Sequence, residues 1–195
     1  MLWLLCLACF VSFGQTAVWN LGACPDIPGM DNFDLTKYMG TWFEYSNVFE
    51  IFQIGAKCVR AQYAIKGETI SVKNEQVNMW WNSYQQVQGS ARPADPAKPN
   101  KAELVVTFEG IPFQSTSSGK VAPNYSVVDT DYTTYAIVYQ CTTFPVWRRE
   151  SLWVLTRRQV PEQALVDSVY KKMTSLGLPV QNLEKTEQEG CSLLP

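Results

Sequence analysis

Apolar and polar residues alternate over most of the chain between Thr41 and Arg157. Short stretches with a period of two occupy residues 59–66, 70–76 and 103–108, and Gly, Pro and Asn separate such stretches. In each stretch one face is apolar and the other is polar, which is typical of antiparallel strands with one buried side. The pattern therefore predicts an antiparallel sheet with one dry face, and no internal repeat is visible.

Two later stretches, residues 135–139 and 152–155, are apolar on both faces, so a further element has to cover their outer side. The next segment predicts a helix that begins near Pro161 and ends before Gly177. Its apolar stripe has helical spacing: Leu165, Val169, Met173 and Leu176. One helix packed on two neighbouring strands of a closed sheet is thus predicted, because closure removes unpaired edges. An immunoglobulin-like sandwich, the alternative, explains neither this helix nor the cysteine spacing.

Composition narrows the class of protein. The 195 residues are enough for one domain, 46% of them are hydrophobic, and the net charge of −2 favours neither disorder nor nucleic-acid binding. Residues 2–13 are apolar and uncharged, a run too short to span a bilayer. They predict a secretory signal over residues 1–14, cleaved before Gln15 or, as second choice, near Ala17, although its n-region has no Lys or Arg. Residues 15–195 would then form one secreted domain.

Four cysteines remain after removal of the signal: Cys24, Cys58, Cys141 and Cys191. In an exported chain this even number predicts two disulfides, and the sequence alone permits three connectivities. The segment Asn124-Tyr125-Ser126 is a glycosylation sequon, so Asn124 is a candidate glycosylation site. The same segment also has the pattern of a strand.

Three short motifs carry the most specific signal in the chain: Gly40-Thr41-Trp42, Thr130-Asp131-Tyr132 and Arg157. Their order, their spacing and the strand-like sequence between them resemble the signature of the lipocalins. The resemblance extends from about Gly22 to Cys191 and is closest to the branch of apolipoprotein D, the Lazarillo proteins and the insect bilin-binding proteins. It implies an all-β fold, an eight-stranded antiparallel up-and-down β-barrel with one C-terminal α-helix packed on the outside.

The resemblance also implies how the cysteines pair and how one end of the barrel is closed. The implied disulfides are Cys24–Cys141 and Cys58–Cys191. Trp42 would point inward at the base of the first strand, with the guanidinium of Arg157 stacked on its ring; Arg158 is the alternative partner. Gly40 would allow a tight turn into the strand, and Asp131 would bond backbone amides in its turn. These roles are structural rather than catalytic.

Strand parity identifies the side chains that would line the inside of such a barrel. They form an aromatic and aliphatic wall with few polar groups: Tyr63, Val72, Asn74, Phe108, Tyr125, Val127, Ala136, Val138, Trp153 and Leu155. The resemblance implies that several of these positions contact ligand. Such a wall suits a flat or elongated apolar molecule, held by contact area and oriented by one or two hydrogen bonds. The alternative is that these side chains fill the interior. Glu44 shares the parity of Trp42, and we expect its buried carboxylate to bond a neighbouring strand.

The loops at one end of the predicted barrel are apolar. The lipocalin topology implies that four loops surround the open mouth: residues 48–57, 79–84, 110–123 and 142–150. Their large side chains include Phe52, Trp80, Trp81, Phe113 and Trp147. The loops at the other end, residues 66–68 and 92–100, are polar and Pro-rich. The apolar rim predicts contact with a membrane, a lipoprotein particle or a partner protein, and the alternative is a lid over the ligand.

The chain contains no histidine, which excludes a Ser-His-Asp arrangement, a His-based zinc site and the commonest haem ligand. Neither paired carboxylates nor a Gly-rich phosphate loop is evident. The sequence therefore predicts a secreted, non-enzymatic carrier of a small hydrophobic molecule (a lipid, steroid, retinoid or fatty acid), with no metal and no cofactor other than a bound bilin or lipid. One alternative is a bilin-binding chromoprotein. Another is an interaction module whose rim docks on a membrane, a lipoprotein or a receptor.

Overall fold

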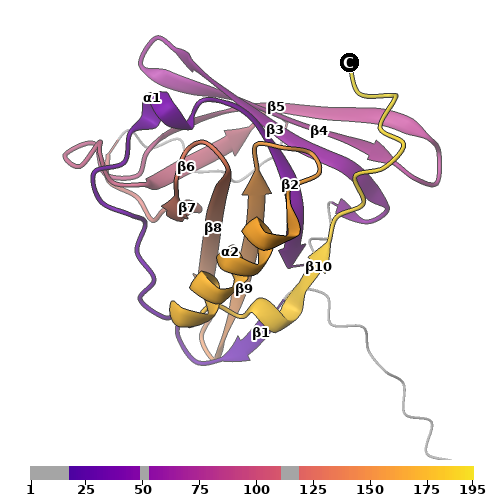
Figure 1. The fold of residues 1–195 in the computed structure, drawn as a ribbon. Helices are drawn as coiled ribbons and strands as arrows, with labels where there is room; N and C mark the ends of the chain where they lie inside the picture. Colours follow the sequence, from indigo (N-terminus) through magenta and orange to yellow (C-terminus); the bar gives the residue numbers. More distant parts are fainter. Residues whose placement is uncertain (1–17, 49–52, 111–118) are drawn as a thin grey trace, which may run out of the picture.

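Eight antiparallel strands close into a barrel (Figure 1). The computed structural model describes residues 18–48, 53–110 and 119–195. The barrel strands are β2 (Gly40–Val48), β3 (Ala56–Lys66), β4 (Thr69–Asn78), β5 (Ser83–Pro93), β6 (Glu103–Phe108), β7 (Tyr125–Thr130), β8 (Tyr135–Thr143) and β9 (Trp147–Thr156). Each pairs with the next along the chain, and β9 pairs back with β2, where Phe43 stands opposite Thr156. The predicted closed barrel is confirmed.

Four short elements have no counterpart among the predicted ones. Strand β1 (Val18–Leu21) extends the sheet beside β9, and β10 (Leu183–Lys185) pairs with the last residues of β2. Helix α1 (Leu35–Tyr38) precedes β2 at the closed end, and η2 (Val180–Asn182) is a single 3-10 turn. Elements of three or four residues are too short to show a period, so the sequence pattern does not reveal them.

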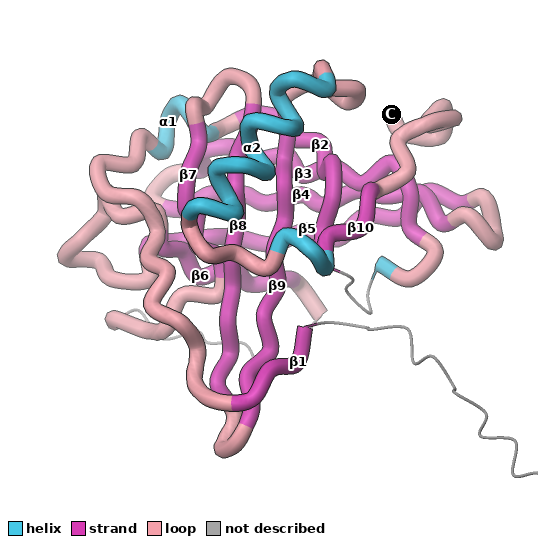
Figure 2. The backbone as a smooth tube through the Cα atoms, turned by 60° about the horizontal axis from the view of Figure 1, so that its bottom comes forward, coloured by secondary structure: helices cyan, strands magenta, loops and turns pink. Residues whose placement is uncertain are grey.

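Two apolar clusters lie on opposite sides of the barrel wall. The inner cluster contains Phe33, Tyr38, Trp42, Tyr63, Ile70, Val72, Ala91, Ala102, Leu104, Val106, Val127, Ala136, Val138 and Leu155. The outer cluster lies between the barrel and helix α2 (Gln163–Ser175) and contains Val48, Ile137, Tyr139, Leu152, Val154, Val169, Met173 and Leu178. Strands β8 and β9 contribute to both clusters, and α2 lies over them (Figure 2). This explains why their sequences are apolar on both faces.

Helix α2 differs from the predicted stripe at one position. Val166 is 4% exposed and belongs to the buried face, whereas Leu176 is 41% exposed. Leu176 lies beyond the last helical residue, and Gly177 follows it with a φ of 72°, the left-handed conformation that ends many helices. The cap therefore turns Leu176 away from the barrel. In the described part of the chain, no helix combines the length and hydropathy needed to cross a membrane.

Two disulfides fasten segments near the two ends of the chain to the barrel. Cys24 is bonded to Cys141 of β8, and Cys191 is bonded to Cys58 of β3, with Cα–Cα distances of 5.8 and 5.6 Å. These are the two pairings that the resemblance implies. They close loops spanning 117 and 133 residues, and loops of that length restrict the unfolded chain strongly.

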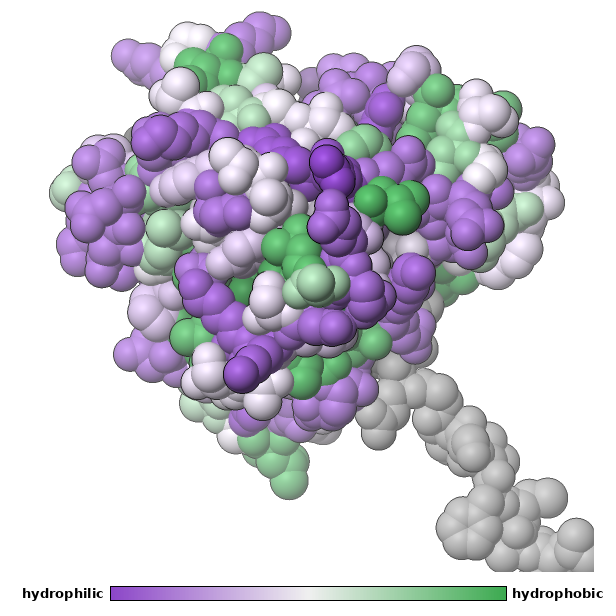
Figure 3. All heavy atoms as spheres, viewed as in Figure 1, coloured by the Kyte–Doolittle hydropathy of each residue, from purple (hydrophilic) through white to green (hydrophobic). Residues whose placement is uncertain are grey.

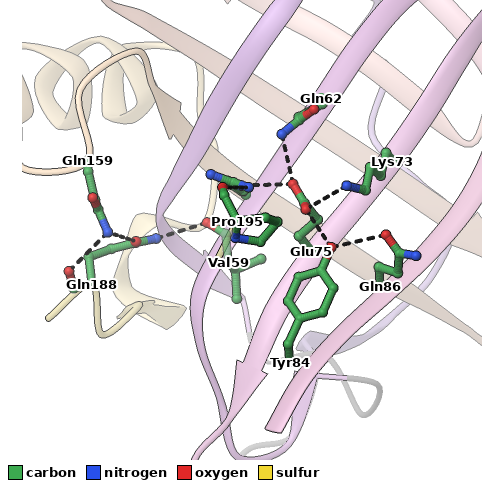
Figure 4. A network of polar contacts seen from close by, with 10 residues as sticks. Val59, Gln62, Lys73, Glu75, Tyr84, Gln86, Gln159, Gln188 and Pro195 are labelled. Atoms are coloured by element: carbon green, nitrogen blue, oxygen red, sulfur yellow. Dashed lines mark hydrogen bonds and ion pairs between the residues drawn. The ribbon is translucent and has the colours of Figure 1, made fainter. Parts of the chain in front are cut away.

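The C-terminal tail fills a gap between β2 and β3. These strands pair through only four residues of β2 and then separate. Beyond that point Gln188 bridges them, because its side-chain nitrogen donates to the backbone carbonyls of Glu44 and Val59 at 2.8 and 2.9 Å. The guanidinium of Arg60 donates to the carbonyl of Pro195 at 2.9 Å (Figure 4). The tail is therefore held against the outer face of β3.

A buried carboxylate organises the outer face of β3, β4 and β5 (Figure 4). Glu75 is 1% exposed, and its oxygens lie 2.8 Å from both Arg60 Nε and Lys73 Nζ. Gln62 and Tyr84 donate to it at 2.8 and 2.6 Å. Burial alone would raise the pKa of Glu75, but its hydrogen bonds and the two cations outweigh burial and lower the pKa from 4.5 to about 2. The ionised carboxylate thus joins three strands.

Glu75 is expected to make folding stability depend on acid. Because folding lowers its pKa from 4.5 to about 2, ionised Glu75 stabilises the folded state above about pH 5, and this contribution is lost as the pH falls toward 2. The shift corresponds to about 3 kcal/mol at most. We expect Glu75→Gln to lower the free energy of unfolding by about 2–3 kcal/mol at neutral pH and to flatten its acid dependence.

Urea denaturation at several pH values measures this effect. Glu68→Gln makes the same substitution at an exposed turn between β3 and β4 and serves as the control. An acid dependence that is as steep in Glu75→Gln as in the unaltered protein would contradict the expectation.

Candidate ligand-binding site

A cation–π stack closes the base of the barrel. The Cζ atom of Arg157 lies 3.7 Å from the centroid of the Trp42 ring, and Trp42 is fully buried. Arg158 instead forms an exposed ion pair with Glu162 at 3.0 Å. The stacking partner is therefore Arg157, the residue that strand parity favours. Such a stack contributes about 2 kcal/mol when water is excluded.

The same guanidinium binds five backbone carbonyls. Its Nε donates to Tyr132 at 3.0 Å, and Nη1 donates to Thr41 at 2.9 Å. Its Nη2 lies 2.8–3.2 Å from the three carbonyls of residues 37–39, where α1 ends. The last carbonyls of a helix have no partner within it, so Arg157 satisfies groups that would otherwise be unpaired. Gly40 has a φ of 97°, and a Cβ atom there would lie 3.3 Å from Nη1.

Asp131 fixes the turn between β7 and β8. Its Oδ1 accepts hydrogen bonds from the amides of Thr133, Thr134 and Tyr135 at 3.0, 2.7 and 3.1 Å. Burial opposes the ionisation of Asp131, but these bonds and one from the Thr134 hydroxyl outweigh it, so its pKa lies below the ordinary value. The turn holds Tyr132 at a φ of 66°, where its carbonyl meets Arg157. All four predicted residues of the closed end thus lie in one hydrogen-bonded base.

The predicted wall residues lie on the inner face of the barrel. Those that are buried are Tyr63, Val72, Val127, Ala136, Val138 and Leu155. Phe108, Tyr125 and Trp153 pack against the same inner cluster and yet are only partly buried. An inward side chain keeps contact with solvent only where the interior is open. We call this open part the cup, lined by Asn74, Phe108, Tyr125 and Trp153.

A separate hollow lies outside the barrel at the closed end. Its volume is about 520 Å³, and it is bordered by α1, the β3–β4 turn and the end of the loop before β6. Acidic and polar residues contribute to its lining, among them Asp34, Glu68 and Asn100. This polar border matches an apolar ligand less well than the cup does.

Three tyrosine hydroxyls meet at the floor of the cup. Tyr63 donates to Tyr125 at 3.0 Å, and the hydroxyls of Tyr38 and Tyr125 are 2.8 Å apart. Burial is the main cause that raises the pKa of Tyr63 to about 12 and the pKa values of Tyr38 and Tyr125 well above the ordinary range. Tyr38 belongs to α1, so strand parity does not identify it. Its place two residues before Gly40 is the signal that puts it at the base.

Asn74 is the polar member of the wall on β4. It stands opposite Ala61 of β3 and Val87 of β5. Its Oδ1 atom is buried, and no described residue donates a hydrogen bond to it. A buried acceptor without a donor is unfavourable by about 1–3 kcal/mol. The oxygen is therefore available to a hydrogen-bond donor on a ligand in the cup.

Glu44 is buried, as its parity predicts, and its carboxylate is hydrogen-bonded. Oε1 accepts from Thr186 at 2.6 Å and from Asn47 at 2.5 Å, and Oε2 accepts from Gln53 at 2.7 Å. Thr186 lies in the tail and Gln53 in a mouth loop, so these partners do not come from a neighbouring barrel strand as expected. Within the described ranges, no group of three or more His, Cys, Asp or Glu residues is arranged to hold a metal ion.

The rim of the barrel exposes aromatic side chains in two places. On the β4–β5 turn, Trp80 and Trp81 are 63% and 72% exposed, with ring centroids 5.8 Å apart. At the β8–β9 hairpin, Trp19 of β1 lies against Phe144 and Trp147 with centroid distances of 5.5 and 6.2 Å. Figure 3 shows hydrophobic side chains at the lower end of the molecule, where β1 and this hairpin lie.

Sequence reasoning identified only part of this rim. It named Trp80, Trp81 and Trp147 but missed Trp19, because the short strand β1 was not among the predicted elements. The other two predicted rim residues, Phe52 and Phe113, lie outside the described residues.

Asn124, the asparagine of the sequon, uses its side-chain amide inside the sheet. Its Oδ1 accepts from the amide of Val106 at 2.7 Å, and its Nδ2 donates to the carbonyl of Val106 at 2.8 Å. This pair of bonds extends the edge of β6 beyond its contact with β7. Glycosylation of Asn124 stays a prediction, and a glycan would be attached to the nitrogen that makes one of these bonds.

A closed eight-stranded barrel with a plugged base and an open apolar interior defines the up-and-down β-barrels that enclose small ligands. Residues 33–188 match the family described as "Lipocalin-like domain". The chain belongs to the lipocalin family.

Its relatives lie in the branch that the motifs indicate. Apolipoprotein D of Cavia porcellus is 31% identical over 95% of this chain and 93% of its own length. The bilin-binding protein of Pieris brassicae is 28% identical over 77% of this chain and 75% of its own. Among solved structures, insecticyanin from the tobacco hornworm Manduca sexta has a TM-score of 0.72 at 26% identity, covering 88% of this chain and 89% of that one.

Replacing Trp42 with Ala is expected to destabilise the fold strongly. The change removes a buried indole and the surface on which Arg157 stacks, so the free energy of unfolding should fall by about 3–5 kcal/mol. The control is Trp81→Ala, at an exposed rim position, which should cost less than about 0.5 kcal/mol. Urea denaturation followed by circular dichroism measures both. A loss below about 1 kcal/mol for Trp42→Ala would show that the base does not depend on the stack.

Proposed function

We propose that this lipocalin is a secreted carrier that binds a small hydrophobic molecule in the cup. The observation that supports it most is the combination of inward aromatic side chains at Phe108, Tyr125 and Trp153 with their incomplete burial, in a barrel closed at its base. Contact area with these rings would supply most of the affinity. The rest of the wall would comprise Tyr63, Val72, Asn74, Ala136, Val138 and Leu155. Binding and release require no catalytic residue.

Export is supported by the sequence and by the disulfides. Disulfides persist mainly in oxidising compartments, and this chain has two. The apolar segment at residues 2–13, which predicts a signal peptide, lies outside the described residues. We therefore place the mature carrier, residues 15–195, outside the cell.

Substitutions in the cup are expected to weaken binding of an apolar probe. A ligand of about 25 heavy atoms at roughly −0.3 kcal/mol per atom binds with a Kd near the micromolar range. Fluorescence titration with N-phenylnaphthylamine should give a Kd of that order. Phe108→Ala and Trp153→Ala should each weaken binding about tenfold, because each removes about 1.5–3 kcal/mol of apolar contact.

Thr107→Ala is the matched control, because Thr107 is adjacent to Phe108 and its hydroxyl lies against that of Ser90 on the outer face of the sheet. If neither cup variant changes the Kd while both remain folded, the ligand binds elsewhere.

A bilin is one ligand that the cup could take. The relative from Pieris brassicae is named for bilin binding. The amide of Asn74 and the hydroxyls at the floor are groups that could meet the N–H and carbonyl groups of such a molecule. Protein purified from its native source would absorb visible light if it carried a bilin. A colourless preparation with a co-purifying lipid, identified by mass spectrometry, would instead support a lipid or steroid carrier.

We also propose that the apolar rim docks on a lipid surface, either a membrane or a lipoprotein particle. The specific observation in favour is the exposure of four tryptophans, Trp19, Trp80, Trp81 and Trp147, which come from three segments of the chain. Tryptophan is well suited to the headgroup layer of a bilayer.

The double variant Trp80→Ser/Trp81→Ser tests this docking. We expect co-sedimentation with phosphatidylcholine vesicles to fall about tenfold, because two large apolar contacts are lost, with no change in the affinity of the cup for the probe. Ile65→Ser is the control, because Ile65 is 51% exposed at the opposite end of the barrel. Loss of probe binding with vesicle binding intact would show that these rings form a lid.

A further inference from the structure

The floor of the cup contains one more hydroxyl proton than its hydrogen bonds use. The three hydroxyls supply three protons, and the cluster contains two bonds, from Tyr63 to Tyr125 and between Tyr38 and Tyr125. If Tyr38 donates in the second bond, Tyr125 keeps an unused proton. If Tyr125 donates, Tyr38 keeps it. In neither case does a described residue accept the third proton.

This unused proton lies next to the space that a ligand would occupy. Tyr38 and Tyr63 are buried, whereas Tyr125 is only partly buried and lines the cup. A buried donor without an acceptor is unfavourable, so a ligand that brings an acceptor to the floor gains more than an unsubstituted hydrocarbon. The floor is therefore selective for a hydrogen-bond acceptor.

The tyrosines remain donors throughout the physiological pH range. Burial raises the pKa values of all three hydroxyls, that of Tyr63 to about 12, so none of them ionises near neutral pH. The floor thus presents a neutral O–H group rather than a phenolate.

Asn74 presents the complementary group nearer the mouth. On β4 it follows Val72, which pairs with Tyr63, so it lies two residues, about 7 Å, along the strand from the level of Tyr63. Because β4 runs from the closed end to the mouth, this displacement is toward the mouth. The buried oxygen of Asn74 accepts a hydrogen bond and has no described donor.

The surroundings disfavour a charged ligand. The inner cluster contains no charged side chain in the described part of the chain. A buried ion needs a partner charge and several hydrogen bonds, and one hydroxyl proton cannot supply them to a carboxylate. The acceptor that fits the floor is therefore an uncharged one.

We infer that the cup selects uncharged apolar ligands that carry a carbonyl at the end nearest the floor and a hydroxyl or N–H group at the level of Asn74. The carbonyl accepts the unused proton of the tyrosine cluster, and the donor satisfies the oxygen of Asn74. This inference rests on the proposed carrier function and adds the chemistry of the ligand to it.

The test uses one rigid skeleton with different polar groups. The probes are androstane, its ketone androstanone, its alcohol androstanol and an androstane carboxylate, each displacing N-phenylnaphthylamine from the protein. The variant Tyr38→Phe/Tyr63→Phe/Tyr125→Phe keeps the rings and removes all three hydroxyls, so it leaves no hydroxyl unpaired. We expect it to weaken androstanone about five- to tenfold and to leave androstane unchanged.

The other arms test the amide and the charge. Asn74→Leu should weaken androstanol relative to androstane by a similar factor, and the unaltered protein should bind the carboxylate more weakly than the ketone. Tyr170→Phe is the matched control, because its hydroxyl bonds Ser46 outside the barrel.

A measurement on the unaltered protein keeps the inference testable if the triple variant does not fold. The infrared carbonyl stretch of bound androstanone should lie below its position in an alkane solvent, because the carbonyl accepts a hydrogen bond. A stretch at the alkane position would overturn the inference, as would a triple variant that weakens androstane and androstanone equally. If the unaltered protein binds no probe, the carrier function itself is wrong.

Discussion

The guanidinium of Arg157 holds the base of the barrel by combining a stack with a set of hydrogen bonds. Its face lies on Trp42 while its edges donate to five backbone carbonyls. A planar cation with five N–H donors can make both kinds of contact at once, which the point charge of lysine cannot. The carbonyls belong to the end of α1, to β2 and to the β7–β8 turn. One side chain of β9 therefore joins the segments that must meet for the barrel to close.

The base also influences the chemistry of the cup, because Tyr38 takes part in both. The carbonyl of Tyr38 accepts from Trp42 Nε1 at 2.8 Å and from Arg157 at 3.2 Å, while its hydroxyl lies 2.8 Å from that of Tyr125. The contacts that plug the barrel thus also orient α1. Helix α1 in turn brings a hydroxyl to a floor that is otherwise apolar. A polar feature of the binding site is in this way coupled to the closure of the fold.

The outside of the barrel is covered in two chemically different ways. Helix α2 covers β8 and β9 with apolar side chains, and their outer residues are apolar to match. The tail covers β3 with carbonyls and amides, and there the sheet presents Arg60, Gln62 and the buried carboxylate of Glu75. The exposed tryptophans of the rim have neither kind of cover. This contrast distinguishes the rim from the rest of the surface and supports a docking role for it.

Local pattern and short motifs were sufficient to predict the closed barrel, the outer helix, the stacked pair Trp42 and Arg157, and the side chains that face inward. These features follow from a period of two or 3.6 residues and from motifs in a fixed order. The short elements β1, α1 and β10 have no period to detect, and the exposure of Leu176 depends on the geometry of a helix cap. Only the tertiary structure decided that Tyr38 reaches Tyr125 and that the oxygen of Asn74 has no donor. Whether a buried polar atom is satisfied depends on which atoms of distant segments come within hydrogen-bonding distance, and no pattern along the chain contains that information.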